Sequence, residues 1–141
     1  MKPLWLLLGL CLWAAPLGAT PFLDNGDSTV TDQASGLMWD QRESTAMTWD
    51  TALTTCEGSV HAGYTDWRLP NRNELESLVD DTKTTAPALD IIAFPSGLSN
   101  PYWASTTNPA ATGFAWFVNF SSGLLGSADK ALSSYYVRCV R

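Results

Sequence analysis

The segment WRLPNRNELESLVD, at residues 67–80, constrains the fold more than any other part of the chain. Pro70 disfavours helical geometry at the residue before it, so residues 67–69 are expected to be extended. Asn71 is a favourable N-cap, and Glu74 stands three residues later, where a capping box places an acid. Three apolar residues follow at helical spacing: Leu75, Leu78 and Val79. The segment therefore predicts an extended stretch that turns into an amphipathic helix.

Residues 1–19 have the pattern of a signal peptide. Lys2 supplies a positive charge, the apolar run over 4–15 is short for a membrane span, and residues 17–19 are suited to a signal peptidase. We therefore expect a mature chain from about Thr20 that is secreted, periplasmic or held at the cell surface, with no membrane insertion after cleavage. An uncleaved membrane anchor is the alternative.

The cysteines agree with export. Cys11 falls within the signal segment. A lipoprotein site there is disfavoured, because Leu10 is bulky and a lipidation site requires a small residue before the cysteine. Cys56 and Cys139 remain, and an even pair in an exported chain is most simply a disulfide. It would close a loop of about 82 residues and add about 4–5 kcal/mol on the chain-entropy model. Two unrelated buried thiols are the alternative.

Composition and charge narrow the function classes. Removal of the signal leaves about 122 residues, enough for one domain over 20–141. The formal net charge is −6 and becomes more negative when Lys2 is removed. Nucleic acids and anionic membranes bind proteins with dense Lys and Arg, so neither is an expected partner.

The order of the predicted elements indicates an α+β fold. One helix is expected from the N-cap Thr48 to Gly58, and a second over 71–80. Asn25-Gly26 predicts a tight hairpin turn within 22–32. Strands are expected at 36–40, 102–107, 114–120 and 135–141, with a surface loop over 81–101 and a turn over 121–134.

Several segments form a combination that is specific to one family. They are GLMW at 36–39, the helix ending in Cys56, residues 62–80, YWAST at 102–106, AWFVNF at 115–120 and YVRCVR at 136–141. Together they resemble the Lcl C-terminal-like domain family, which is similar to sulfatase-modifying and C-type-lectin-like folds. The resemblance covers about 22–141. It implies two helices packed on a mainly antiparallel, partly irregular sheet, with the first helix tied to the last strand, the two places that Cys56 and Cys139 occupy.

The resemblance also implies a function. The family's namesake is a trimeric adhesin that binds sulfated glycosaminoglycans through this module, behind a collagen-like stalk. This chain has no such stalk, so trimers are not enforced. It is also acidic, which disfavours affinity for polysulfated chains. The expectation is an exported, non-enzymatic module that binds an extracellular glycan in adhesion. A protein-recognition module using the loops 81–101 and 121–134, or a structural component of an envelope assembly, are the alternatives.

Two sets of residues are candidates for ligand contact. The first is a basic patch, although paired or scattered surface charge is the favoured explanation of its members: Arg68, Arg72, Lys83, Lys130, Arg138 and Arg141. On the strand at 114–120, Trp116 belongs to the expected core face, and Phe117 and Asn119 lie on the opposite one. The predicted ligand-binding residues are Asn108, Phe117, Asn119, Lys130, Tyr135 and Arg138.

No catalytic constellation is expected. His61 is the only histidine in the sequence, and its place in a Gly-containing turn favours a solvent-exposed side chain. Glu74 and Glu76 point to different faces of a helix. We therefore predict no enzymatic activity and no cofactor.

No metal site is expected either. One His and two Cys without close spacing cannot form a zinc cluster. Asp24, Asp27 and Asp32 offer oxygen ligands suited to calcium, but an acidic hairpin turn explains them as well. We favour the turn.

Overall fold

The computed structural model describes residues 21–42, 44–96 and 99–141. The predicted signal peptide, its cleavage site and Cys11 lie outside these residues. Within the described ranges, the helices are all too short or too polar to cross a membrane.

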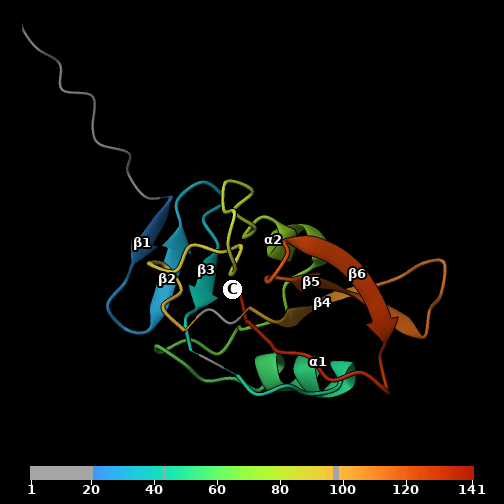
Figure 1. Cartoon of the computed structure of the whole chain (residues 1–141). Helices are drawn as coiled ribbons and strands as arrows, with labels where there is room; N and C mark the ends of the chain where they lie inside the picture. The colour runs from blue at the N-terminus through green and yellow to red at the C-terminus, as the bar shows by residue number, and fades with distance from the viewer. Residues whose placement is uncertain (1–20, 43, 97–98) are drawn as a thin grey trace, which may run out of the picture.

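Two short helices and two three-stranded antiparallel sheets make up the described chain, so the predicted α+β class is confirmed. The elements are β1 (Phe22–Asp24), β2 (Thr29–Asp32), β3 (Met38–Asp40), α1 (Trp49–Glu57), α2 (Arg72–Glu76), β4 (Pro101–Thr107), β5 (Phe114–Asn119) and β6 (Leu124–Asp129). The first sheet has the order β1-β2-β3 and the second has β4-β5-β6. Figure 1 shows the two sheets on opposite sides of the molecule, with the C-terminus between them.

The predicted hairpin at 22–32 is present, but its turn is longer than an Asn-Gly pair alone requires. Asp24 pairs with Val30, and the Asn25 N–H donates to the Thr29 carbonyl at 3.0 Å. Asp27 accepts from the Thr29 N–H at 3.1 Å, so its carboxylate stabilises the additional turn residues.

The two helices begin where the sequence predicts. In α1, Thr48 and Gly58 are the caps, although the Thr48 hydroxyl bonds the Thr51 hydroxyl and makes no side-chain cap bond. In α2, Asn71 and Glu74 form the predicted capping box.

The second helix is shorter than the predicted range 71–80. It ends at Glu76, because the N–H groups of Leu78 and Val79 donate three residues back, to Leu75 and Glu76, and tighten the chain into a turn. The apolar stripe is nevertheless buried as predicted: Leu75 is fully buried and Leu78 is 3% exposed.

The second sheet is covered on both faces. Val118 of β5 packs in one cluster with Leu75 of α2, and Ala115 packs in another with Ala52 of α1. The face of β5 opposite Trp116, which carries the predicted ligand residues Phe117 and Asn119, is therefore partly covered, and Ala115 on it is fully buried. The reason is that α1, far away in the sequence, packs on that face.

The end of the chain differs from the prediction in two respects. The predicted turn 121–134 contains a strand, β6, whose six residues all pair with β5. The predicted strand 135–141 makes only isolated bridges in the described structure, because its backbone bonds are shared among several elements. Tyr136 accepts from Trp103 of β4, and Arg141 exchanges two bonds with Met38 of β3. The C-terminal segment therefore joins the two sheets.

Candidate functional site

A hollow of about 310 Å³, here called the polar hollow, lies beside the disulfide. Six of its nine lining residues have polar side chains, namely four hydroxyls and one carboxylate–guanidinium pair. The lining residues are Asp40, Arg42, Ser44, Thr45, Met47, Thr55, Ser59, Val137 and Cys139. Its volume is at the lower end of the range for small-molecule sites, about 300–1,000 Å³.

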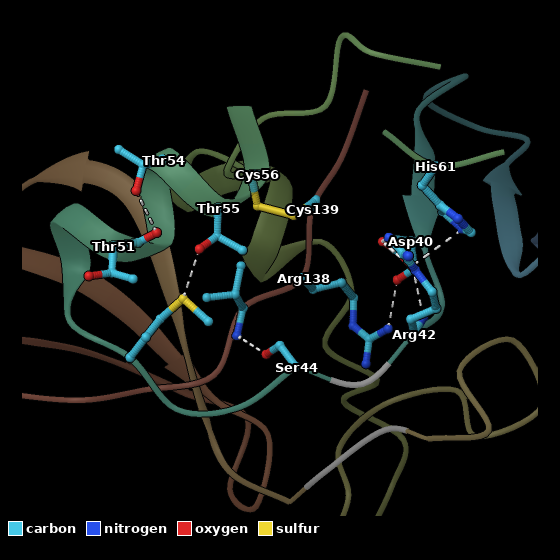
Figure 2. Close-up of a disulfide and its surroundings, with 12 residues drawn as sticks. Asp40, Arg42, Ser44, Thr51, Thr54, Thr55, Cys56, His61, Arg138 and Cys139 are labelled. Atoms are coloured by element: carbon cyan, nitrogen blue, oxygen red, sulfur yellow. Dashed lines mark hydrogen bonds and ion pairs between the residues drawn. A yellow bond between two sulfur atoms is a disulfide. The ribbon is translucent and has the colours of Figure 1, made fainter. Parts of the chain in front are cut away.

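The predicted disulfide is present and forms part of this wall. Cys56 and Cys139 are joined with an S–S distance of 2.05 Å across a sequence separation of 83. Cys56 belongs to α1 and Cys139 to the C-terminal segment. In Figure 2 the bond lies between Thr55 on one side and Asp40, Arg42 and His61 on the other. The bond therefore ties α1 to the C-terminal segment, whose Cys139 carbonyl in turn accepts from the Asp40 N–H at 3.0 Å.

The charged part of the hollow is a two-bond ion pair at the end of β3. Arg42 Nη2 donates to Asp40 Oδ2 at 2.6 Å and Nε donates to Oδ1 at 3.0 Å. The Asp40 side chain is 8% exposed and that of Arg42 is 48% exposed. The hydrogen bond to Asp40 raises the pKa of Arg42 above its ordinary value. His61 Nε2 lies 3.6 Å from Asp40 Oδ1. The hollow thus presents a guanidinium that is held by a buried carboxylate.

The hydroxyl groups complete the wall. Ser44 Oγ accepts from the Val137 N–H at 2.8 Å, which leaves its own O–H available as a donor. The Thr55 hydroxyl lies 3.4 Å from Met47 Sδ, a weak acceptor. Thr45 is exposed and Ser59 is half-buried. A wall that combines these donors and acceptors with apolar surface from Met47 and Val137 suits a polyhydroxylated ligand.

Arg138 does not line the polar hollow, although it was predicted to bind ligand. Its side chain is 1% exposed, and its guanidinium lies 4.6 Å from the Phe94 ring centroid and 5.5 Å from that of Tyr102. Its Nη1 donates to the Asp40 carbonyl at 2.9 Å. Arg138 therefore acts inside the protein, behind β3.

Three of the other predicted residues are brought near one another on the α1 side of the second sheet. The rings of Phe117 and Tyr135 are 4.7 Å apart, and both pack against the buried cluster that contains Trp103. Lys130 Nζ lies 4.1 Å from the Trp49 ring centroid and donates to Thr107 Oγ1 at 2.8 Å. These side chains are half-buried, and their contacts are chiefly with each other.

Asn108 and Asn119 lie at opposite ends of β5 and do not share a site. Asn108 follows β4 and donates to Ser127 Oγ at 3.1 Å. Asn119 closes the turn into β6, where it accepts from the Ser121 N–H at 2.9 Å. Ligand contact by these two residues stays a prediction, and the structure gives each of them a local structural role.

The remaining arginines of the predicted basic patch are each paired with a carboxylate. Arg68 donates to both Glu74 oxygens at 2.8 Å, and this hydrogen bonding lowers the pKa of Glu74. Arg141 donates to Asp66 at 2.7 Å, which lowers the pKa of that carboxyl.

Arg72 lies 4.6 Å from the Trp116 ring centroid and 3.9 Å from Glu76. In the described residues, then, the arginines agree better with paired surface charge than with one anion-binding patch.

The aspartates of the first hairpin support its turn. Asp24 accepts from the Gly26 N–H at 2.8 Å, and Asp32 accepts from the Ala34 N–H at 2.9 Å. Within the described ranges, there is no group of three or more His, Cys, Asp or Glu arranged to hold a metal ion.

The polar hollow was not predicted from the sequence. Its residues come from 40–59 and from 137–139, so they meet only in the folded chain. A local signal does exist, since the run DQREST at 40–45 is polar and begins at the last residue of a strand. A polar run of this kind is also typical of an ordinary surface loop.

Comparison with known families gives the relationship of the chain. The model of one family, described as the Lcl C-terminal domain, matches residues 28–141. The chain belongs to this family. The Lcl C-terminal domain thus includes every residue of the polar hollow, both cysteines of the disulfide and all of the second sheet. No match was found among curated proteins.

Proposed function

We propose that this Lcl C-terminal domain is an exported, non-enzymatic binding module with a C-type-lectin-like architecture, and that it binds a glycan in the polar hollow during adhesion at a cell surface or matrix. The observation that carries the proposal is the hollow itself, in which four hydroxyl side chains share the wall with the Asp40–Arg42 pair. A planar guanidinium beside hydroxyls matches the adjacent hydroxyl groups of a sugar ring.

Two further features support the proposal. The disulfide agrees with an oxidising compartment, which favours export. It also ties the first helix to the end of the chain, the arrangement expected of a C-type-lectin-like fold. The wall is held by this bond and by the ion pair, so little ordering of the site has to accompany binding.

The test is a panel of sulfated and uncharged polysaccharides, presented to the purified chain at low and high salt. We expect binding to an uncharged glycan that persists at high salt, because hydroxyl contacts are not screened as charge contacts are. Arg42→Gln should weaken that binding about tenfold, since it removes a charged hydrogen-bond donor.

The matched control is Arg72→Gln, which removes the same charge from α2, away from the hollow wall. It should leave glycan affinity unchanged. Absence of binding across the panel, or an equal loss in both variants, would contradict the proposal.

A further inference from the structure

A second hollow, of about 640 Å³, lies between the first hairpin and the chain that follows α2. Its wall shares Phe22 and Asp90 with a smaller hollow of about 290 Å³ under β1. We call the two together the β1 groove. Its lining residues are Pro21, Phe22, Leu23, Asp24, Val30, Asp32, Ala34, Ser35, Ser77, Leu78, Val79, Asp80, Asp81, Asp90, Ile92 and Ala93. It shares no lining residue with the polar hollow.

The β1 groove carries exposed apolar surface. Leu23 is 53% exposed and Ile92 is 78% exposed, and Ile91, next to it in the chain, is 52% exposed. These are three of the large apolar side chains that are exposed in the described part of the molecule. Leu78 and Val79 add apolar surface to the wall. A concave apolar area at the surface of a folded domain typically marks a site of interaction.

The rim of the β1 groove is negative. Five of its lining residues are aspartates: Asp24, Asp32, Asp80, Asp81 and Asp90. Among the described residues, no Lys, Arg or His lines it, and Lys83 is close to Asp80 but outside the wall. Complementarity of charge therefore favours a cationic occupant and disfavours sulfated glycans and anionic lipid.

We propose that the β1 groove docks a basic and apolar segment of a protein partner, in which Lys or Arg side chains alternate with side chains of the size of Leu. The apolar side chains bury against Leu23, Val79 and Ile92, and the cations meet the aspartates of the rim. This inference does not rest on glycan binding at the polar hollow, so either can fail without the other.

The probe is a synthetic peptide of alternating Lys and Leu, titrated into the ¹⁵N-labelled full chain and followed by NMR. A peptide of the same charge with Ser in place of Leu is the comparison. We expect the Lys-Leu peptide to shift the amide resonances of Leu23, Val79 and Ile92. It should also bind about tenfold more tightly than the Lys-Ser peptide, because burial of a Leu side chain contributes more than the roughly 1.4 kcal/mol that a tenfold difference in affinity requires.

Two variants test the charged contacts and the apolar contacts of the groove separately. Asp81→Asn with Asp90→Asn should weaken the Lys-Leu peptide about tenfold, since it removes two rim charges but keeps an oxygen to accept the Ile92 N–H that Asp90 holds at 2.9 Å. Ile92→Ser, at an exposed position, should weaken the Lys-Leu peptide and leave the Lys-Ser peptide unchanged.

The matched control is Asp50→Asn with Glu57→Gln, which makes the same charge change on exposed positions of α1. It should change affinity less than twofold, or about 0.4 kcal/mol. Equal weakening by the control pair, equal binding of the two peptides, or shifts located away from the groove would overturn the proposal. If the double Asp variant fails to fold, Ile92→Ser alone tests the proposal. A lower affinity for only the Lys-Leu peptide supports docking in the groove, and an unchanged affinity for that peptide contradicts it.

Discussion

The two sheets of this domain differ in how completely they are covered. The second sheet has α2 on one face and α1 on the other, and it contributes residues to both buried clusters. The first sheet has three short strands, and the C-terminal segment joins β3 while β1 lies at the other edge. Each of the three hollows is bordered by a residue of the first sheet, and none of them by a strand residue of the second.

The second sheet therefore contributes mainly to stability, whereas the first sheet borders the surfaces that are available for binding. A sheet that is packed on both sides supplies the rigid body, but it has little free surface for a ligand. The short first sheet leaves polar strand ends and exposed apolar side chains next to the loops, where binding residues of rigid scaffolds are commonly found. This explains why the ligand surface predicted on β5 is half-buried while the hollows lie elsewhere.

The largest expected effect comes from removing the disulfide, which joins α1 to the C-terminal segment that runs between the two sheets. Cys56→Ser with Cys139→Ser should lower the free energy of unfolding by about 4–5 kcal/mol, because the unfolded chain regains the freedom of a long loop. Urea unfolding of the oxidised protein and the variant measures the difference. Reductant should have no effect on the variant, and equal stabilities would show that the bond does not constrain the chain.

The packing of the second sheet can be tested at Gly126 of β6. A Cβ there would lie 2.5 Å from Phe117 Cζ, and the Phe117 ring is held against Tyr135. Gly126→Ala should therefore cost about 1–3 kcal/mol in thermal or urea unfolding.

Gly113→Ala is the control for this substitution, since nothing lies within 4 Å of its added Cβ. Combining Gly126→Ala with Phe117→Leu should recover part of the loss. An unchanged free energy of unfolding in Gly126→Ala would show that the α1-facing side of the second sheet is not tightly packed.

A smaller effect is expected at the start of α2, which covers the second sheet. Glu74→Gln should lower stability by about 1 kcal/mol at pH 7, through a weaker capping box and the loss of the partly exposed pair with Arg68. Since folding lowers the pKa of Glu74, its contribution to stability is present above the ordinary glutamate pKa of 4.5 and is lost as the pH falls through the lower folded-state pKa. Unfolding curves at several pH values measure this.

Glu76→Gln provides the comparison for that pH series, because Glu76 is exposed and lies 3.9 Å from Arg72. It should have a smaller effect at every pH. A Glu74→Gln difference that does not shrink in acid would mean that charge is not its source.

The smallest expected effect concerns the first sheet. Calcium and a chelator should leave the melting temperature unchanged, because Asp24, Asp27 and Asp32 accept hydrogen bonds within their own hairpin. Differential scanning fluorimetry with and without added calcium is sufficient. A large fall in melting temperature on adding chelator would show that a bound ion stabilises this hairpin and constrains the first sheet.

Prediction from sequence succeeded where the interacting residues are close in the chain. The capping box of Asn71 and Glu74 and the limits of α1 are examples, because a few neighbouring residues satisfy the backbone groups at a helix end. The disulfide was also predicted, on the grounds of number and compartment. Strand β6 was missed because LLGSAD contains Gly and Asp, which strands disfavour, and its pairing partner β5 stabilises it instead.

The sequence by itself thus determined the α+β class, the helix starts, the disulfide and the relationship to the Lcl C-terminal domain. Only the tertiary structure decided that α1 covers the Phe117 side of β5, that Arg138 is buried behind β3, and that Asp40 and Arg42 share a wall with Cys139. The physical reason is that burial and site geometry depend on contacts between segments up to about a hundred residues apart, such as the bond from Arg138 to the Asp40 carbonyl across a separation of 98. Local sequence patterns do not contain those contacts.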